Sequence, residues 1–349
     1  MLVAPLDWGL GHTTRCIPII NELLAQGFEV VIAAETDAAV LLKKEFLNIK
    51  ILRLKGYRIK YAKNKAAFWA KIILQIPKII VAIKREKKWL EKVIDEHKID
   101  IVIADNRFGL YSKKAHCIFI THQLHIKTGN GVTEKIAQLI NYQHINKFNE
   151  CWVIDEEKEN NFAGELSHPH KMPLIPTKYI GALSRFKKYT VEKKYDVVAV
   201  LSGPEPQRSI FENILLGQMQ YLKIKIALVR GLPNAENILN AGNIKIYNHL
   251  PAEELNELML ASKIIIARSG YTTVMDIAAL QQKAIFVPTP AQSEQEYLAQ
   301  YLSNKKYCSF ASQISFNIEK DIAKIESFAL APYPACTQSL LKGIIATLQ

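Results

Sequence analysis

Serine–glycine pairs stand at the end of two apolar, strand-length runs in the C-terminal half of the chain. These pairs are Ser202-Gly203 and Ser269-Gly270, and a helical pattern begins after each of them. Small residues at such a turn leave backbone N–H groups free to receive phosphate oxygens, and the helix dipole adds to the attraction. Ordinary capping of the second helix by Ser269 or Thr272 accounts equally well for that pair alone. Two such turns in one half of the chain favour a diphosphate site.

Other polar residues near these turns extend the predicted site. Arg208 and Arg268 could each place a guanidinium against a diphosphate. Asp276 lies about one and a half turns into the second helix, where it could bind a ribose hydroxyl pair or remain solvated. A third segment offers hydrogen-bonding partners for a sugar, although its Ser293 and Glu296 also have capping-box spacing. Its candidates are Thr289, Gln292, Glu294, Gln295 and Glu296.

The N-terminal half offers two candidates for a general base. His12 follows Gly9-Leu-Gly11 at the start of the first predicted helix, where the dipole favours the neutral imidazole that can accept a proton. Asp105 ends an apolar run, and partial desolvation there is expected to raise its pKa. Capping of the next segment is an equally good role for Asp105. The polar triplet Thr121-His122-Gln123 ends the following run.

Apolar runs of strand length alternate with helical patterns along the chain, which predicts parallel, doubly wound sheets. The pattern restarts near Asp196, so we predict domains at residues 1–182 and 195–325, with a helical segment at 326–349 that returns to the first domain. The expected helices include Thr13–Gln26, Ser209–Tyr221, Ala252–Ala261 and Thr272–Gln281. The expected strands are Leu2–Pro5, Glu29–Ala33, Ile49–Leu52, Asp100–Ala104, Cys117–Ile120, Glu150–Ile154, Asp196–Leu201, Ile224–Val229, Ile244–Tyr247, Lys263–Ala267 and Ala284–Val287.

The run from Ser262 to Leu298, with RSGYTT, DIAAL, VPTP and EQEYLA, resembles the donor-binding half of MurG-like glycosyltransferases. The resemblance implies the GT-B fold, in which two Rossmann-like domains face a central cleft. It also implies that Ser269, Gly270 and Thr272 contact the diphosphate, Asp276 the ribose and Gln295 the donor sugar. Asp276 stands where a glutamate is usual, and Glu296 where a second glutamine is usual.

Two further segments share the resemblance. Asn248-His-Leu-Pro251 looks like the family loop whose backbone reads the base, which would place Leu250 against uracil. Asp7–Arg15 is similar to the glycine-rich, histidine-containing loop of the same enzymes, so Gly11 would lie near the ligand. No DxD-like motif occurs on the donor side, and we therefore expect no metal cofactor.

Positive charge is concentrated between Lys55 and Lys92, where twelve basic residues oppose only Glu86 and Glu91 in a chain of net charge +12. The segment Ala66–Ile83 is apolar apart from Lys71, Gln75 and Lys78. An apolar face with a basic rim is typical of a helix that docks on an anionic bilayer, although a core helix with a solvated edge fits the same pattern. Two lysines and a proline argue against a membrane span. Aromatic residues are not interleaved with the charges, so nucleic acid is not the expected partner.

The favoured function is transfer of a hexose-type sugar from a UDP-sugar to a lipid-linked or membrane-associated acceptor, with inversion. The alternatives are a nucleotide-sugar hydrolase or 2-epimerase of the same fold, and a non-catalytic protein that binds nucleotide-sugars or lipids. Five scattered cysteines and the lack of a signal-peptide pattern predict a cytoplasmic protein at the inner face of the membrane.

Overall fold

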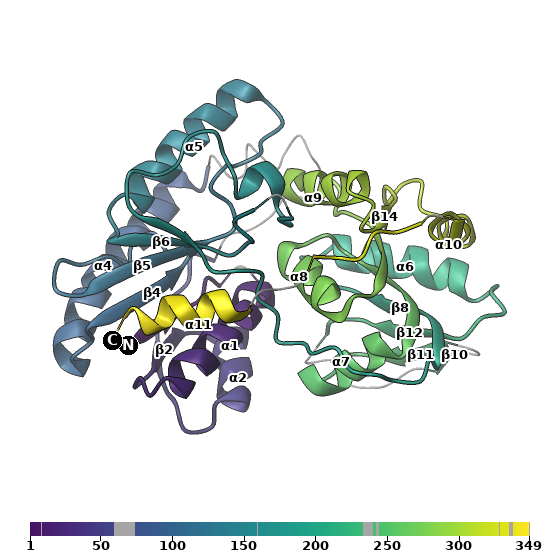
Figure 1. The fold of residues 1–349 in the computed structure, drawn as a ribbon, viewed down its shortest axis with the longest axis horizontal. Helices are drawn as coiled ribbons and strands as arrows, with labels where there is room; N and C mark the ends of the chain where they lie inside the picture. Colours follow the sequence, from purple (N-terminus) through teal and green to yellow (C-terminus); the bar gives the residue numbers. More distant parts are fainter. Residues whose placement is uncertain are drawn as a thin grey trace. The chain divides into compact units, whose positions relative to one another are not determined.

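The computed structural model describes residues 1–7, 9–58, 74–158, 160–232, 240–241, 244–327, 329–334 and 338–348. These residues form two compact units (Figure 1). The first contains the chain up to Leu183 together with the C-terminal helix. The second begins at Ser184. No helix within the described ranges is long and apolar enough to cross a membrane.

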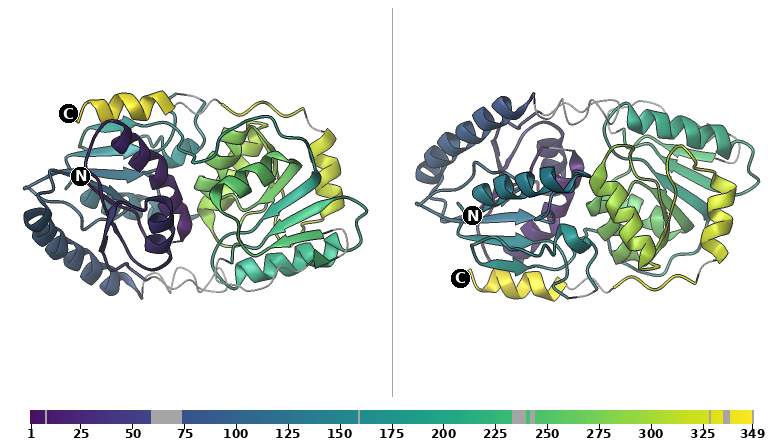
Figure 2. Two further views of the ribbon diagram at one scale, coloured as in Figure 1. Left: turned by 90° about the horizontal axis from the view of Figure 1, so that it is seen from below. Right: turned by 90° about the horizontal axis from the view of Figure 1, so that it is seen from above.

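A sheet of parallel strands in the order β3-β2-β1-β4-β5-β6-β7 forms the centre of the first unit. Figure 2 shows α4 on one side of this sheet and the C-terminal helix α11 on the other, and α11 packs against α1. The strands are β1 (Leu2–Ala4), β2 (Val31–Ala34), β3 (Lys50–Arg53), β4 (Ile101–Asp105), β5 (His116–Thr121), β6 (Glu150–Val153) and β7 (Thr177–Tyr179). The helices are α1 (Leu10–Ala25), α2 (Thr36–Glu45), α4 (Ile76–His97), α5 (Gly131–Ile145), α11 (Gln338–Ala346) and the short η1 (Gly164–Leu166).

The second unit repeats this strand order as β11-β9-β8-β12-β13-β14 and adds β10 antiparallel at one edge. Its helix α6 contacts α10. The strands are β8 (Tyr195–Val200), β9 (Ile226–Val229), β10 (Asn240–Ala241), β11 (Ile244–Tyr247), β12 (Ser262–Ala267), β13 (Lys283–Phe286) and β14 (Ser309–Phe310). The helices are α6 (Gln207–Met219), α7 (Ala252–Leu260), α8 (Tyr271–Leu280), α9 (Ser293–Asn304) and α10 (Ile318–Ser327).

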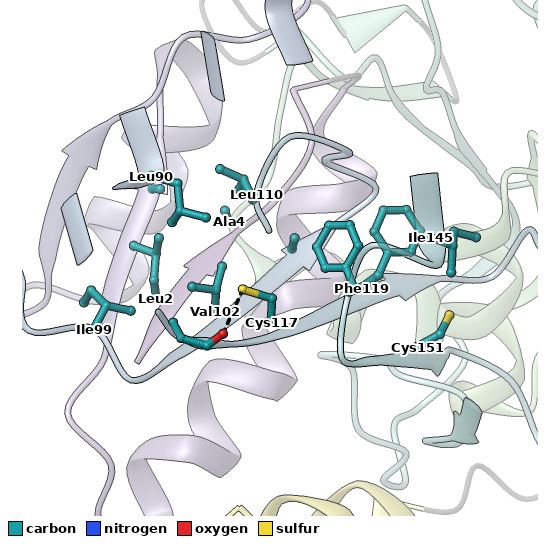
Figure 3. Packing of buried hydrophobic residues seen from close by; sticks show 14 of the residues in the cluster. Leu2, Ala4, Leu90, Ile99, Val102, Leu110, Cys117, Phe119, Ile145 and Cys151 are labelled. Atoms are coloured by element: carbon teal, nitrogen blue, oxygen red, sulfur yellow. Dashed lines mark hydrogen bonds between the residues drawn. The ribbon is translucent and has the colours of Figure 1, made fainter. Parts of the chain in front are cut away.

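Both cores follow from continuous apolar strands that helices cover on both faces. In the first unit, Leu2 and Val102 from the sheet pack with Leu90 of α4, and Phe119 packs with Ile145 of α5 (Figure 3). In the second, β12 places Ile265 and Ile266 at the sheet centre with no exposed surface. Such burial explains why these strands could be recognised from composition alone.

Every predicted strand overlaps an observed one, and the predicted class of two doubly wound parallel sheets is confirmed. The sequence did not predict β7, β10 and β14, which have two or three residues each. Strands this short bury too few side chains to leave a pattern. Residues 66–73 of the predicted apolar segment Ala66–Ile83 lie outside the described residues, and α4 begins at Ile76.

Candidate active site

In each unit, the strand order reverses between two neighbouring strands. The carboxyl ends of these two strands lie close to the start of a helix. In the first unit, β1 and β4 are adjacent although β2 and β3 intervene in sequence. In the second, β8 and β12 are adjacent in the same way. The chain runs to opposite sides of the sheet from such a pair, so the strand ends are left open to ligands. His12 and Asp105 lie at this point in the first unit, and both Ser-Gly turns lie at it in the second.

A group of buried charged and polar side chains lies at this point in the first unit. His12 Nδ1 is 2.9 Å from Asp105 Oδ2 and 2.7 Å from Arg15 Nη2. Arg15 grips both carboxylate oxygens of Asp105, with Nε donating to Oδ2 at 3.0 Å and Nη2 donating to Oδ1. Its Nη1 lies 2.9 Å from His122 Nδ1. Because a guanidinium only donates, His122 Nδ1 accepts this hydrogen bond.

Asp105 does not have the raised pKa that the sequence led us to expect. Its carboxyl is 1% exposed, and burial alone would raise the pKa, but Arg15 and His12 together hold it well below its ordinary value. A carboxylate that stays ionised so firmly is a poor proton acceptor. The prediction of Asp105 as a general base is therefore corrected. Its position suits a residue that orients His12.

His12 remains the better candidate for a base. Burial, followed by the charge of Arg15, lowers the pKa of its imidazole, so the ring is neutral at pH 7. About a sixth of the side chain is exposed, at 16%, whereas Asp105 beneath it is covered. Gly9, at φ 84°, precedes α1 in a left-handed conformation that glycine adopts readily, and it brings the chain into the helix two residues before Gly11.

Arg15 is the functional candidate that the sequence reasoning missed. It lies three residues after His12 in α1, and residues at this spacing share one face of a helix. That spacing was a usable signal for Arg15. The partnership with Asp105, 90 residues away, became visible only in the folded chain.

The two Ser-Gly turns of the second unit lie beside the loop that follows β13. A Cβ atom placed on Gly203 would be 3.8 Å from Thr289 Oγ1. Gly203 adopts φ 102° and is exposed together with Ser202. Gly270 caps α8, and a Cβ atom there would meet nothing within 4 Å. The backbone at both turns is thus open to a ligand, as anion binding at a helix N-terminus requires.

Ser269 and Gln295 form hydrogen bonds that hold together the Ser269-Gly270 turn, the loop after β13 and the start of α9. Ser269 has no exposed surface, and its Oγ donates to the Gln295 carbonyl at 2.7 Å. The Gln295 side chain accepts from Thr289 N at 2.9 Å and donates to Gln292 Oε1 at 2.7 Å. Thr289 Oγ1 is buried without a hydrogen-bond partner among the described residues. A buried hydroxyl in this state is a marked candidate for a ligand contact.

Asp276 lies in α8 and accepts a hydrogen bond from Ser184 Oγ at 2.6 Å. Burial raises the pKa of its carboxyl to about 6, against the smaller opposing effects of Ser184 and Arg185. At pH 7 the group therefore carries a charge that its surroundings compensate only in part. Hydroxyl groups of a ligand would stabilise that charge.

Arg208 and Arg268 are committed to contacts within the second unit. Arg208 is 6% exposed and donates to Glu205 and Glu212, each at 2.6 Å. The Nη atoms of Arg268 donate to the carbonyls of Val287, Pro288 and Gln207 and to Gln313 Oε1, and its guanidinium lies over the Phe211 ring. These contacts take up most of the donors of the two arginines, but Arg268 Nε is buried without a hydrogen-bond partner among the described residues. Direct contact of either arginine with a diphosphate stays a prediction. A sequence cannot reveal how many of these donors are already occupied.

The remaining predicted residues keep positions compatible with their roles. Thr272 is partly exposed in the first turn of α8, and Gly11 is partly exposed in the first turn of α1. Leu250 is buried after β11, in a loop that Arg230 braces by donating to Asn248 Oδ1 at 2.9 Å. Their contacts with a ligand stay predictions.

Comparison with known proteins assigns both halves of the chain to glycosyltransferases. Residues 216–345 match the glycosyltransferase family 28 C-terminal domain, and residues 6–144 match glycosyl transferase family 1. A relative from Glaesserella parasuis is the UDP-N-acetylglucosamine--N-acetylmuramyl-(pentapeptide) pyrophosphoryl-undecaprenol N-acetylglucosamine transferase. It is 24% identical over 335 residues, which cover 90% of this chain and 86% of the relative. The chain is a MurG-like glycosyltransferase.

Other comparisons place this glycosyltransferase among GT-B proteins. The Sulfurihydrogenibium enzyme with the same name as the Glaesserella relative is 26% identical over 145 residues, or 41% of this chain and 39% of that enzyme. The crystal structure of Acinetobacter baumannii MurG is 15% identical and covers 99% of this chain and 92% of its own, with a TM-score of 0.53. A Listeria monocytogenes protein assigned as a UDP-N-acetylglucosamine 2-epimerase is 13% identical with a TM-score of 0.63, covering 99% and 95%. The GT-B fold is thereby confirmed.

Proposed function

We propose that this glycosyltransferase moves a hexose-type sugar from a UDP-sugar to the hydroxyl group of a lipid-linked or membrane-associated acceptor, with inversion. The observation that carries the proposal is the direct hydrogen bond between His12 and the buried Asp105 carboxylate at the strand ends of the first unit. A neutral imidazole held in this way suits the deprotonation of an acceptor hydroxyl. The relatives named above, whose own donor is a UDP-sugar, support the choice of donor.

The roles of the two units follow from their chemistry. We assign the proton of the neutral imidazole to His12 Nδ1, which donates to Asp105 Oδ2 at 2.9 Å. In this tautomer Arg15 Nη2 donates to Asp105 Oδ1 and not to the nearby His12 Nδ1, because that nitrogen then has no lone pair to accept with. That tautomer leaves the Nε2 lone pair free to take the proton from the acceptor hydroxyl. The acceptor oxygen then forms a bond to the anomeric carbon as the bond from that carbon to the diphosphate oxygen breaks. Backbone N–H groups at the starts of α6 and α8 would stabilise the departing UDP.

Peripheral contact with an anionic membrane, at the cytoplasmic face, is part of the proposal. Four apolar side chains at the beginning of α4 and just before it are exposed, namely Leu74, Ile76, Ile80 and Val81. Ile79 and Ile83 of the same segment pack against Leu6, Tyr57 and Ala82 and so belong in part to the core. An exposed apolar face within the basic segment would bind vesicles rich in anionic lipid at low salt and release them as salt screens the charges.

Product analysis tests the transferase proposal. A panel of UDP-, GDP- and TDP-sugars is first screened by thermal shift, and a UDP-sugar should raise the unfolding midpoint most. The selected donor is then incubated with the protein, with and without a membrane lipid extract, and the anomeric configuration of any product is determined. Transfer only in the presence of the extract, at the same rate in EDTA, is expected. Free sugar or an epimer formed from the donor alone would establish the hydrolase or the 2-epimerase instead.

A further inference from the structure

A basic cavity of about 230 Å³ opens beside the carboxyl end of β3 in the first unit. Four of its six lining residues are cationic. The lining residues are Arg53, Leu54, Lys55, Arg58, Arg85 and Trp89. None of them belongs to the group around His12 and Asp105.

The loop after β3, which carries Lys55 and Arg58, is fixed by two carboxylates. Glu35 accepts from Gly56 N at 2.7 Å and from the Arg58 guanidinium at 3.0 Å. Asp7 accepts from Tyr57 N at 3.1 Å and from Arg58 N at 3.3 Å. A Cβ atom on Gly56 would lie 1.8 Å from the Asp7 carboxylate, so only glycine lets the loop approach this closely. The backbone of this wall of the cavity is therefore held in place by contacts within the first unit.

Helix α4 supplies the opposite wall. Arg85 and Trp89 are one turn apart, so both side chains lie on the same face of the helix. Arg85 donates to the Gly56 carbonyl at 3.3 Å, which joins the helix to the loop. This bond uses one of the five N–H donors of the guanidinium. Among the described residues this is the one hydrogen bond of Arg85, so its guanidinium keeps donors for an incoming anion.

The charge of the cavity is compensated only in part. Glu35 is the one carboxylate paired with its lining among the described residues, through Arg58 and, at 4.0 Å, Arg53. Lys55 is exposed and has no hydrogen-bond or ion-pair partner within the same set. A single carboxylate ligand would leave most of this charge unbalanced, whereas a phosphate ester or a diphosphate carries about two or more negative charges and matches the arginine forks.

We propose that this cavity binds the phosphate or diphosphate group of a phosphorylated ligand, with the Trp89 ring against the apolar or cyclic part next to the phosphate. The ligand can be a free phosphorylated molecule or a phospholipid headgroup, because both present the same group to the four cations. The inference goes beyond the transferase proposal and does not depend on it. Phosphate binding here needs neither His12 nor the turns of the second unit.

Calorimetric titration with inorganic pyrophosphate at constant ionic strength tests the proposal on the full chain. The double variant Lys55→Ala/Arg85→Gln should bind pyrophosphate at least about tenfold more weakly than the wild type, because hydrogen bonds to charged groups are lost. The matched control Lys84→Ala/Lys88→Ala removes two positive charges from the same helix region without touching the lining, and it should bind within about twofold of the wild type. Unfolding midpoints of both variants confirm that the first unit is intact.

Vesicles of phosphatidylcholine with and without phosphatidic acid identify the source of the phosphate. Displacement of vesicle-bound protein by pyrophosphate supports a phospholipid headgroup in the cavity. Pyrophosphate binding without such displacement supports a free phosphorylated ligand. Equal weakening by both double variants, or no binding of pyrophosphate or phosphatidic acid by the wild type, would overturn the proposal. The thermal shift by UDP-sugars is read in parallel, and it should be unchanged in both variants if the donor site lies where we propose.

Discussion

The two units share a strand order but place opposite kinds of chemistry at the same point of their sheets. In the first unit, Arg15 and Asp105 are buried opposite charges that pair with each other, and His12 contacts both. In the second, the equivalent strand ends carry open backbone at Gly203 and Gly270, and the neighbouring loop after β13 carries a buried hydroxyl on Thr289. The fold determines where a site forms, and the side chains at that place determine its chemistry.

This difference separates a preorganised group from a site that a ligand must complete. Moving a proton requires a base whose surroundings are fixed in advance, because reorganising charges during the reaction is costly. Binding a nucleotide diphosphate requires donors that are left unsatisfied until the ligand arrives. Removal of a member of the first group should therefore disturb catalysis or folding strongly. Substitutions at the second site should raise the stability of the protein while they weaken its affinity for the donor.

The largest expected effect is the loss of turnover in His12→Gln. We expect kcat to fall by about 10²–10⁴-fold, as for the loss of a general base, while the thermal shift by a UDP-sugar is retained. Because the His12 pKa is lowered, the acid limb of the wild-type pH–rate profile should lie below about pH 6.5.

A histidine in the same unit provides the control for this loss. His116 is the first residue of β5, at the end of the strand away from the group around Asp105, and it pairs with Glu150. The substitution His116→Gln should leave kcat unchanged. Turnover of His12→Gln within a few-fold of the wild type would show that the buried group of the first unit does not supply the base.

The next largest effect concerns Arg15. Arg15→Met leaves the buried Asp105 carboxylate without its cation, and we expect a loss of about 3–5 kcal/mol in the free energy of unfolding, measured by urea titration. Asp105→Asn added to Arg15→Met should restore part of that loss because the uncompensated charge is gone. Lys114→Met, which breaks an exposed pair with Asp95, should change stability little. Equal effects of the two single substitutions would show that burial does not distinguish the group around Asp105.

The smallest effect, and one of opposite sign, concerns Asp276. Its folded-state pKa of about 6 lies above the ordinary value of 3.8, so the wild type loses stability as pH rises between these values. Asp276→Asn avoids this loss and keeps an acceptor for Ser184. We expect it to be more stable by about 1–3 kcal/mol at pH 7.5 and unchanged near pH 4, with about tenfold weaker UDP-sugar binding.

The matched control for Asp276 has a carboxyl with the opposite shift. Asp196 accepts from Lys263 and from Lys225 N, and these contacts hold its pKa below the ordinary value. Asp196→Asn should therefore lose stability at pH 7.5 and leave donor binding intact. A stabilised Asp276→Asn with undiminished donor affinity would remove Asp276 from the proposed binding site.

Much of the molecule could be predicted from the chain because local patterns report burial. The runs that became β4 and β12 are apolar throughout, as strands covered on both faces must be. The two Ser-Gly turns and Gly9-Leu-Gly11 stand out because small residues after an apolar run are typical of a turn that leads into a helix. Edge strands such as β14 escaped notice because their two residues carry no pattern.

The sequence could not show which side chains have shifted pKa values or which hydrogen-bond donors are already in use. The sequence predicts a raised pKa for Asp105, but Arg15 beside it helps to hold that pKa low. The sequence also cannot show that both Nη atoms of Arg268 donate to other residues of the second unit. A side chain's pKa and its free hydrogen-bond donors depend on neighbours that are distant in sequence. The sequence by itself determined the two sheets, the turns at their ends and the basic segment, because these arise from local residue order. Only the tertiary structure decided which polar groups are already satisfied and which remain available to a ligand.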